Sequence, residues 1–92
     1  SASEDDIRKE LKYVIQDPEG IHARPAGELI KLLKTFESAV TISKGDQAVD
    51  AKRIFGVMSL AAKKGQEITM TVEGTDEETA IDQIQKFLAE NL

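Results

Sequence analysis

Apolar and polar residues alternate along three stretches of the chain, over residues 9–16, 39–44 and 67–73. A two-residue period is typical of a β-strand with one buried and one solvated face. A fourth, shorter stretch over residues 47–50 follows directly on the turn signal Gly45-Asp46. We therefore expect four strands, of which the second and third form a hairpin.

Two longer stretches instead place apolar residues three and four positions apart, which predicts amphipathic helices. The first runs from Ala23 to about Phe36, and the last begins at Thr75. The hydroxyl of Thr75 and the carboxylate of Glu78 have the spacing of a capping box. A short helix is expected over residues 53–62, with Gly65 as its end signal.

The resulting order of elements is β-α-β-β-α-β-α. Such an order gives an antiparallel or mixed sheet with helices on one face, which is the α+β two-layer sandwich. With 92 residues, of which 40% are hydrophobic, the chain has enough apolar material for one small core. We expect a single domain over residues 9–92, preceded by a flexible, acidic extension over residues 1–8.

Composition argues against several classes of function. The chain has no cysteine, which excludes a disulfide and a thiolate metal site. Its net charge of −5 argues against binding to nucleic acid, which requires positive charge. One histidine is too few for a typical catalytic zinc site, so we expect no metal and no cofactor. No apolar run is long enough to cross a membrane and no signal peptide is visible, so we expect a cytoplasmic protein without membrane insertion.

The candidate chemistry lies in the stretch Gly20-Ile21-His22-Ala23-Arg24-Pro25-Ala26, which holds the only histidine. Proline is favoured at the start of a helix, so His22 should stand just before the first turn. The N–H groups of Ala23 and Arg24 then have no helical acceptor, and the positive end of the helix dipole attracts anions, phosphate in particular. Because imidazole is a nucleophile near neutral pH, this set of groups favours a histidine that carries a phosphoryl group.

In that interpretation, the guanidinium of Arg24 holds the phosphoryl oxygens as a charge clamp. From position alone, a simpler interpretation of each residue stays open. His22 is then an exposed loop histidine with a capping role, and Arg24 is a solvated surface arginine.

The same stretch resembles the phospho-acceptor motif of HPr, the family of histidine-containing phosphocarriers in the bacterial sugar phosphotransferase system. The resemblance includes Gly56-Val57-Met58-Ser59-Leu60, the Lys63-Lys64-Gly65 turn and Thr75-Asp76-Glu77-Glu78, and it covers roughly Lys9 to Asn91. It implies a four-stranded antiparallel sheet covered on one face by three helices. It also implies a monomeric carrier, rather than an enzyme, whose His22 accepts a phosphoryl group at Nδ1 from Enzyme I, ultimately from phosphoenolpyruvate. The carrier then passes that group to a histidine of Enzyme IIA in sugar uptake.

Ile54, Phe55 and Met58 form an apolar stripe on the short helix, and such spacing is typical of core residues. The resemblance implies instead that this stripe lies beside His22 and docks the partner proteins. Aromatic and methionine side chains suit such a role, so we expect some of them to be exposed. We also expect Gly27 to be a docking residue, because a glycine permits close approach of another backbone. In the simpler interpretation, a glycine within a helix only reduces stability.

Arg53 departs from the pattern of the family, because Gram-positive members have a serine there that a dedicated kinase phosphorylates. Arginine cannot be modified by that route, so regulation through a phosphoserine at this position is not expected. Ser59 lies elsewhere in the second block, where we expect a buried structural role. Two alternatives stay open, an HPr-type regulatory binding protein and a specialised paralogue that reports its phosphorylation state to a regulator.

Overall fold

The computed structural model describes residues 8–92, so nearly all of the expected extension over residues 1–8 lies outside the described residues. Seven elements follow one another in the predicted order. They are β1 (Arg8–Val14), α2 (Ala23–Leu33), β2 (Ala39–Lys44), β3 (Gln47–Asp50), α3 (Ile54–Ser59), β4 (Glu67–Glu73) and α4 (Glu77–Asn91).

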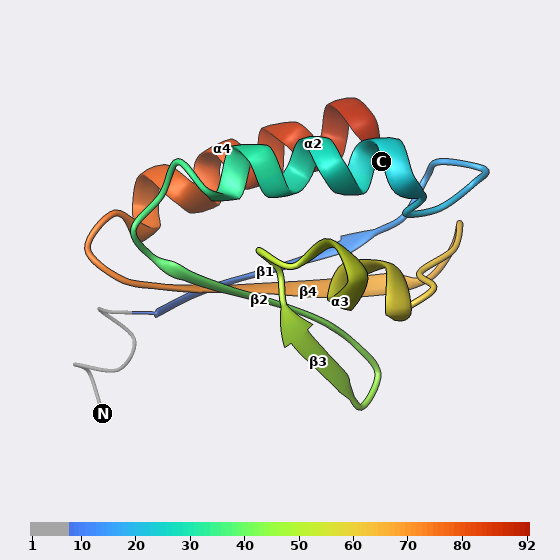
Figure 1. Ribbon diagram of the computed structural model, residues 1–92, viewed down its shortest axis with the longest axis horizontal. Coiled ribbons are helices and arrows are strands. Elements are labelled where there is room, and N and C mark those ends of the chain that lie inside the picture. The colour runs from blue at the N-terminus through green and yellow to red at the C-terminus, as the bar shows by residue number, and fades with distance from the viewer. Residues whose placement is uncertain (1–7) are drawn as a thin grey trace.

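The strands form one antiparallel sheet in the order β1-β4-β2-β3. Helices α2 and α4 lie side by side over one face of this sheet, and α3 packs beside β3 and against α2 (Figure 1). Within residues 8–92, no helix lies on the opposite face of the sheet (Figure 1). This arrangement confirms the α+β two-layer sandwich with three helices on one side.

The core lies between the sheet and the helices. Ile68, Met70 and Val72 alternate along β4 and are fully buried, whereas the intervening Thr69 and Thr71 face the open side and are half-buried. Full burial of such a side chain contributes about 1.5–3 kcal/mol. The helices supply the opposing apolar stripes, which include Ala26, Leu29, Leu33, Val57, Ala80, Ile84 and Leu88.

Two of the predicted helices end earlier than expected. Helix α2 stops at Leu33, because Lys34 and Thr35 form a turn in which the Thr35 N–H and hydroxyl both donate to the carbonyl of Leu32. Helix α3 covers Ile54–Ser59 rather than residues 53–62. It ends at a backbone reversal where Ala61 has a φ of 49°, so Gly65 does not terminate it; Gly65 lies in the next turn with a φ of 89°.

The predicted capping box at the start of α4 is wrong. The helix begins at Glu77, and the preceding Asp76 makes no side-chain capping bond. Its carboxylate accepts hydrogen bonds from the N–H of Glu37 at 2.8 Å, the N–H of Ser38 at 3.0 Å and the Ser38 hydroxyl. The Asp76 carboxylate therefore joins the start of α4 to the loop that follows α2, a contact between segments far apart in the sequence.

Candidate functional site

The loop between β1 and α2 has a fixed conformation. The carboxylate of Asp17 accepts a hydrogen bond from the N–H of Glu19 at 2.8 Å, and the carbonyl of Asp17 accepts one from the N–H of Gly20 at 2.9 Å. Gly20 has a φ of 69°, a conformation that favours glycine. A Cβ added at Gly20 would lie 2.3 Å from the carbonyl oxygen of Ala62, so no side chain fits there. Ile21 donates to that same carbonyl at 2.9 Å, which fixes the approach to α2.

The end of α4 holds the other side of this loop. The backbone oxygen of Leu92 accepts hydrogen bonds from the N–H groups of Gln16 at 2.5 Å and Asp17 at 2.7 Å. The side chain of Leu92 is buried in the core, which anchors the acceptor. His22 is therefore presented by a loop that the carbonyls of residues 62 and 92 support from two sides.

His22 occupies the N-cap position of α2, as the place of Pro25 predicts. Its backbone is extended, with φ −104° and ψ −176°, and its carbonyl accepts the first helical hydrogen bond from Ala26 at 3.0 Å. The side chain of His22 makes no capping bond, and the first turn of α2 contains no acidic residue. Within residues 8–92, the N–H groups of Ala23 and Arg24 have no hydrogen-bond acceptor. The start of α2 is therefore open to an anion.

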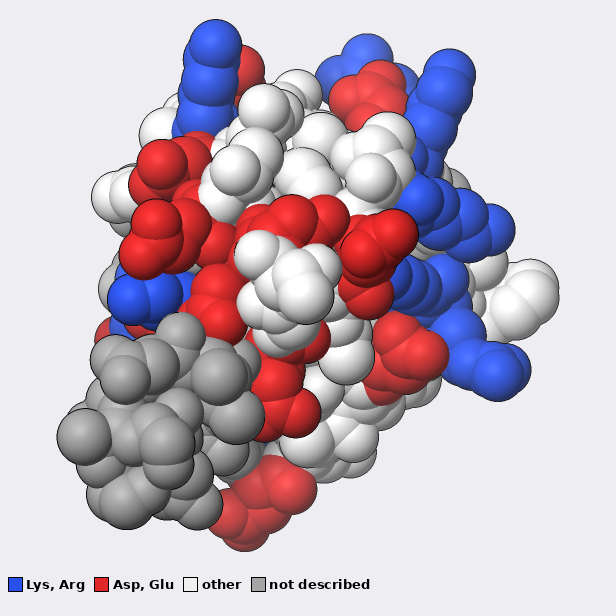
Figure 2. Space-filling view, turned by 90° about the vertical axis from the view of Figure 1, so that its left-hand side faces the viewer, with Lys and Arg blue, Asp and Glu red and all other residues white. Residues whose placement is uncertain are grey.

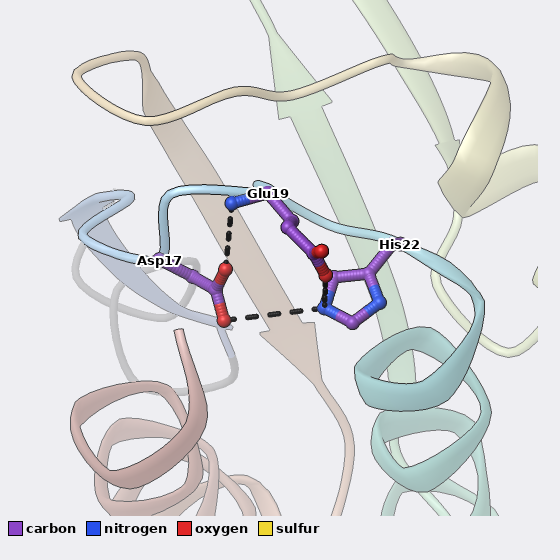
Figure 3. A network of polar contacts seen from close by, with 3 residues as sticks. All are labelled: Asp17, Glu19 and His22. Atoms are coloured by element: carbon purple, nitrogen blue, oxygen red, sulfur yellow. Dashed lines mark hydrogen bonds and ion pairs between the residues drawn. The ribbon is translucent and has the colours of Figure 1, made fainter.

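The imidazole of His22 has different surroundings at its two nitrogens. Nε2 lies 3.2 Å from Oε2 of Glu19 and 4.0 Å from Oδ2 of Asp17. Figure 3 shows both carboxylates on the Nε2 side of the ring, while Nδ1 points away from them. The His22 side chain is 33% exposed, so a partner can reach it.

Arg24 is exposed in the first turn of α2. Among residues 8–92, no carboxylate lies within ion-pair distance of its guanidinium. Its charge is thus available to an external anion.

The chain is similar to known proteins over nearly its whole length. The family described as "PTS HPr component phosphorylation site" matches residues 9–90. A phosphocarrier protein HPr from Lysinibacillus sphaericus is 40% identical over 82 residues, which are 89% of this chain and 93% of that protein. The chain belongs to the HPr family.

Solved HPr structures share the fold. HPr from Bacillus anthracis superposes with a TM-score of 0.82 at 32% identity, over 88% of this chain and 96% of that one. The histidine-containing phosphocarrier protein from Mycoplasma gives a TM-score of 0.86 at 35% identity, over 89% and 93%. HPr proteins are phosphocarriers of the phosphotransferase system, in which sugar transport is coupled to phosphohistidine chemistry. Within the described part of the chain, no helix is long and apolar enough to cross a membrane.

The candidate docking residues of this HPr differ in exposure. Phe55 is 85% exposed and Met58 37%, whereas Ile54 is half-buried and packs against the core. Gly27 faces Ile54: a Cβ added at Gly27 would lie 3.9 Å from Cδ1 of Ile54, an ordinary contact. Packing within the chain therefore does not require a glycine at position 27.

Arg53 stands at the N-cap of α3 without a side-chain capping bond, where the family resemblance places a serine. Its guanidinium is 82% exposed and lies 3.8 Å from the carboxylate of Asp50. The expectation of a buried Ser59 is wrong. Ser59 is exposed at the end of α3, and its hydroxyl donates to the carbonyl of Gly56 at 2.6 Å.

Asp17 and Glu19 are the residues that sequence reasoning missed, since their segment reads only as a loop. The three-residue spacing of Glu19 and His22 is the sequence feature that indicates this contact, because the tight turn that Gly20 permits brings the two side chains together. Asp17, Glu19 and His22 each have one ligand atom within 4.8 Å of the others, so this group has the donors that could hold a divalent cation.

Proposed function

We propose that this HPr accepts a phosphoryl group on His22 from Enzyme I and passes it to a histidine of Enzyme IIA. The observation that carries the proposal is the position of His22 at the uncapped start of α2. The nucleophilic ring and the N–H groups of Ala23 and Arg24 lie there, and the exposed side chain of Arg24 extends from the same turn.

These groups match the charge of a phosphoryl group. The N–H groups of Ala23 and Arg24 and the positive end of the helix dipole stabilise the phosphoryl oxygens. The Arg24 guanidinium adds charge-assisted hydrogen bonds in a fork geometry. Phosphoryl transfer needs mainly positioning and charge stabilisation, so this short list of groups is sufficient. The protein converts no free substrate and acts as a carrier rather than an enzyme.

The exposed apolar residues of α3 support docking of both partners on one face. Phe55 and Met58 lie on the helix that packs against α2, the helix that His22 begins. An aromatic and a methionine side chain on a small exposed surface are typical of transient interfaces. We place Ile54 and Gly27 at the edge of the same surface. A monomer in the cytoplasm fits a carrier that presents one face to two partners in turn.

The test is phosphorylation by Enzyme I and phosphoenolpyruvate, followed by intact mass measurement. We expect an acid-labile gain of one phosphoryl group in the wild-type protein and no gain in His22→Ala. Addition of an Enzyme IIA should then remove the group. A wild-type protein that gains no phosphoryl group, or a gain that persists in His22→Ala, would refute the carrier proposal.

A further inference from the structure

Two carboxylates face one nitrogen of His22 and leave the other nitrogen free (Figure 3). We propose that Asp17 and Glu19 are positioning residues that keep the ring proton on Nε2. Nδ1 then carries the lone pair that attacks phosphorus. This inference rests on the proposed role of His22 and adds the reason why one of its two nitrogens reacts.

The chemistry of the ring makes such a selection necessary. A neutral imidazole has one N–H, and the hydrogen-bonding surroundings decide which nitrogen holds it. An ionised carboxylate only accepts hydrogen bonds, so it favours a proton on the nitrogen that it faces. Both Asp17 and Glu19 lie on the Nε2 side, at 4.0 Å and 3.2 Å, and within residues 8–92 no carboxylate pairs with Nδ1.

The two carboxylates differ in how firmly they are held. The Asp17 side chain is 26% exposed, its Oδ1 accepts the N–H of Glu19, and its own N–H is bound to Leu92. Its Oδ2 is therefore fixed towards the ring. Glu19 is closer to Nε2, but its side chain is 74% exposed. The Asp17 carboxylate thus keeps a constant position relative to Nε2. The Glu19 carboxylate lies nearer to Nε2 but is held less firmly.

The same carboxylates stabilise the phosphorylated ring. As Nδ1 attacks, a bond forms between Nδ1 and phosphorus, and the bond from phosphorus to the leaving atom of the donor breaks. The electron pair of that bond leaves with the donor. The proton stays on Nε2, so the ring becomes a phosphorylated imidazolium whose positive charge faces Asp17 and Glu19. Transfer to the acceptor histidine reverses these changes and returns the neutral ring.

The test is the tautomer of His22, measured by ¹⁵N NMR of the imidazole at alkaline pH in EDTA, which removes any divalent cation. Asp17→Asn, Glu19→Gln and the double variant are compared with Asp82→Asn, which removes one exposed charge from the middle of α4. An Asn at position 17 keeps an oxygen that can accept the N–H of Glu19, so the loop should stay folded. Its amide N–H group favours a lone pair on Nε2 instead of a proton.

We expect the Nε2–H form to predominate in the wild type and in Asp82→Asn. In the double variant, we expect the Nδ1–H form to become at least as abundant, and phosphorylation by Enzyme I to slow about tenfold. Spectra of the backbone amides establish that each variant is folded, and the spectra of Glu19→Gln alone decide the outcome if Asp17→Asn disturbs the loop.

A predominant Nδ1–H form in the wild type, or an unchanged tautomer in the double variant, would overturn the inference even if His22 is phosphorylated normally. Conversely, a protein whose tautomer responds as expected but which gains no phosphoryl group would overturn the proposed carrier role alone. The two results come from separate measurements, so the two failures are distinguishable.

Discussion

Helices α2 and α4 run antiparallel, so they begin at opposite ends of the molecule (Figure 1). The start of α2 has no acidic residue in its first turn, whereas α4 begins with Glu77 and Glu78. Figure 2 looks onto the end where α4 begins and shows carboxylates spread across its middle. Glu37 and Glu73 are exposed on the segments that meet there. The first turn of α4 thus contains its own carboxylates, whereas the first turn of α2 contains none.

The difference shows that a helix start attracts negative charge whatever its source. At α4, Glu77 is 6% exposed, and its Oε2 has no hydrogen-bond partner in the part of the chain that the structure describes. The positive end of the helix offsets part of the cost of burying this carboxylate. At α2, Asp17 and Glu19 face Nε2 of His22, and within residues 8–92 no carboxylate accepts the N–H groups of Ala23 and Arg24. These two donors therefore remain available for a phosphoryl group.

The largest loss of phosphoryl transfer at the start of α2 is expected when the charge of Arg24 is reversed. We expect Arg24→Glu to slow phosphorylation by Enzyme I about a hundredfold, because a clamp on the phosphoryl oxygens becomes a repelling carboxylate. Initial rates with phosphoenolpyruvate and Enzyme I measure the effect. Lys86→Glu, which makes the same charge change at an exposed position of α4, is the matched control. Equal rates for both variants would show that Arg24 is an ordinary surface residue.

A milder change makes the start of α2 resemble that of α4. Ala23→Glu places a carboxylate in the first turn, where it stabilises the helix by about 0.5 kcal/mol. The same carboxylate competes with the incoming phosphoryl group, so we expect phosphorylation to slow about tenfold. Ala23→Gln is the neutral control, with similar size and helix propensity. If both variants transfer at the wild-type rate, the open helix start is not part of the phosphate site.

The smallest effect on phosphoryl transfer is expected from a substitution of Asp76, which precedes α4 at the end of the molecule opposite His22. The hydroxyl of Ser38, followed by the backbone N–H of Glu37, lowers the pKa of Asp76 below its ordinary value of 3.8. A carboxyl whose pKa is lowered on folding stabilises the protein above its unfolded pKa, and this contribution is lost as the pH falls through the folded pKa. Asp76→Asn should therefore reduce stability at neutral pH and weaken the loss of stability on acidification.

Denaturant midpoints of both proteins at neutral pH and at several acid pH values test this expectation. The rate of phosphorylation should be the same in both, because Asp76 is at the far end from His22. A wild-type protein and an Asp76→Asn variant with parallel pH profiles would show that this carboxylate titrates alike in the folded and unfolded chain.

The sequence predicted the parts of the structure that depend on local patterns. The alternation along residues 67–73 defined β4 to the residue, and Pro25 placed the start of α2 beside His22. The start of α4 was mispredicted, because Asp76 is bound by residues that are distant in sequence. The environment of Nε2 was missed for the same reason. Asp17 lies in a loop that the carbonyls of Ala62 and Leu92 support from distant parts of the chain, and no local pattern encodes those contacts.

The hydrogen bonds from Gln16 and Asp17 to Leu92 make the loop before His22 dependent on the last turn of α4. Helix ends open at a lower free-energy cost than helix interiors, although the buried side chain of Leu92 opposes that opening here. Each time this turn unwinds, two loop amides lose their acceptor together. Their hydrogen exchange should follow the fraying of α4 rather than global unfolding, so the order of this loop is set by the local stability of a helix end.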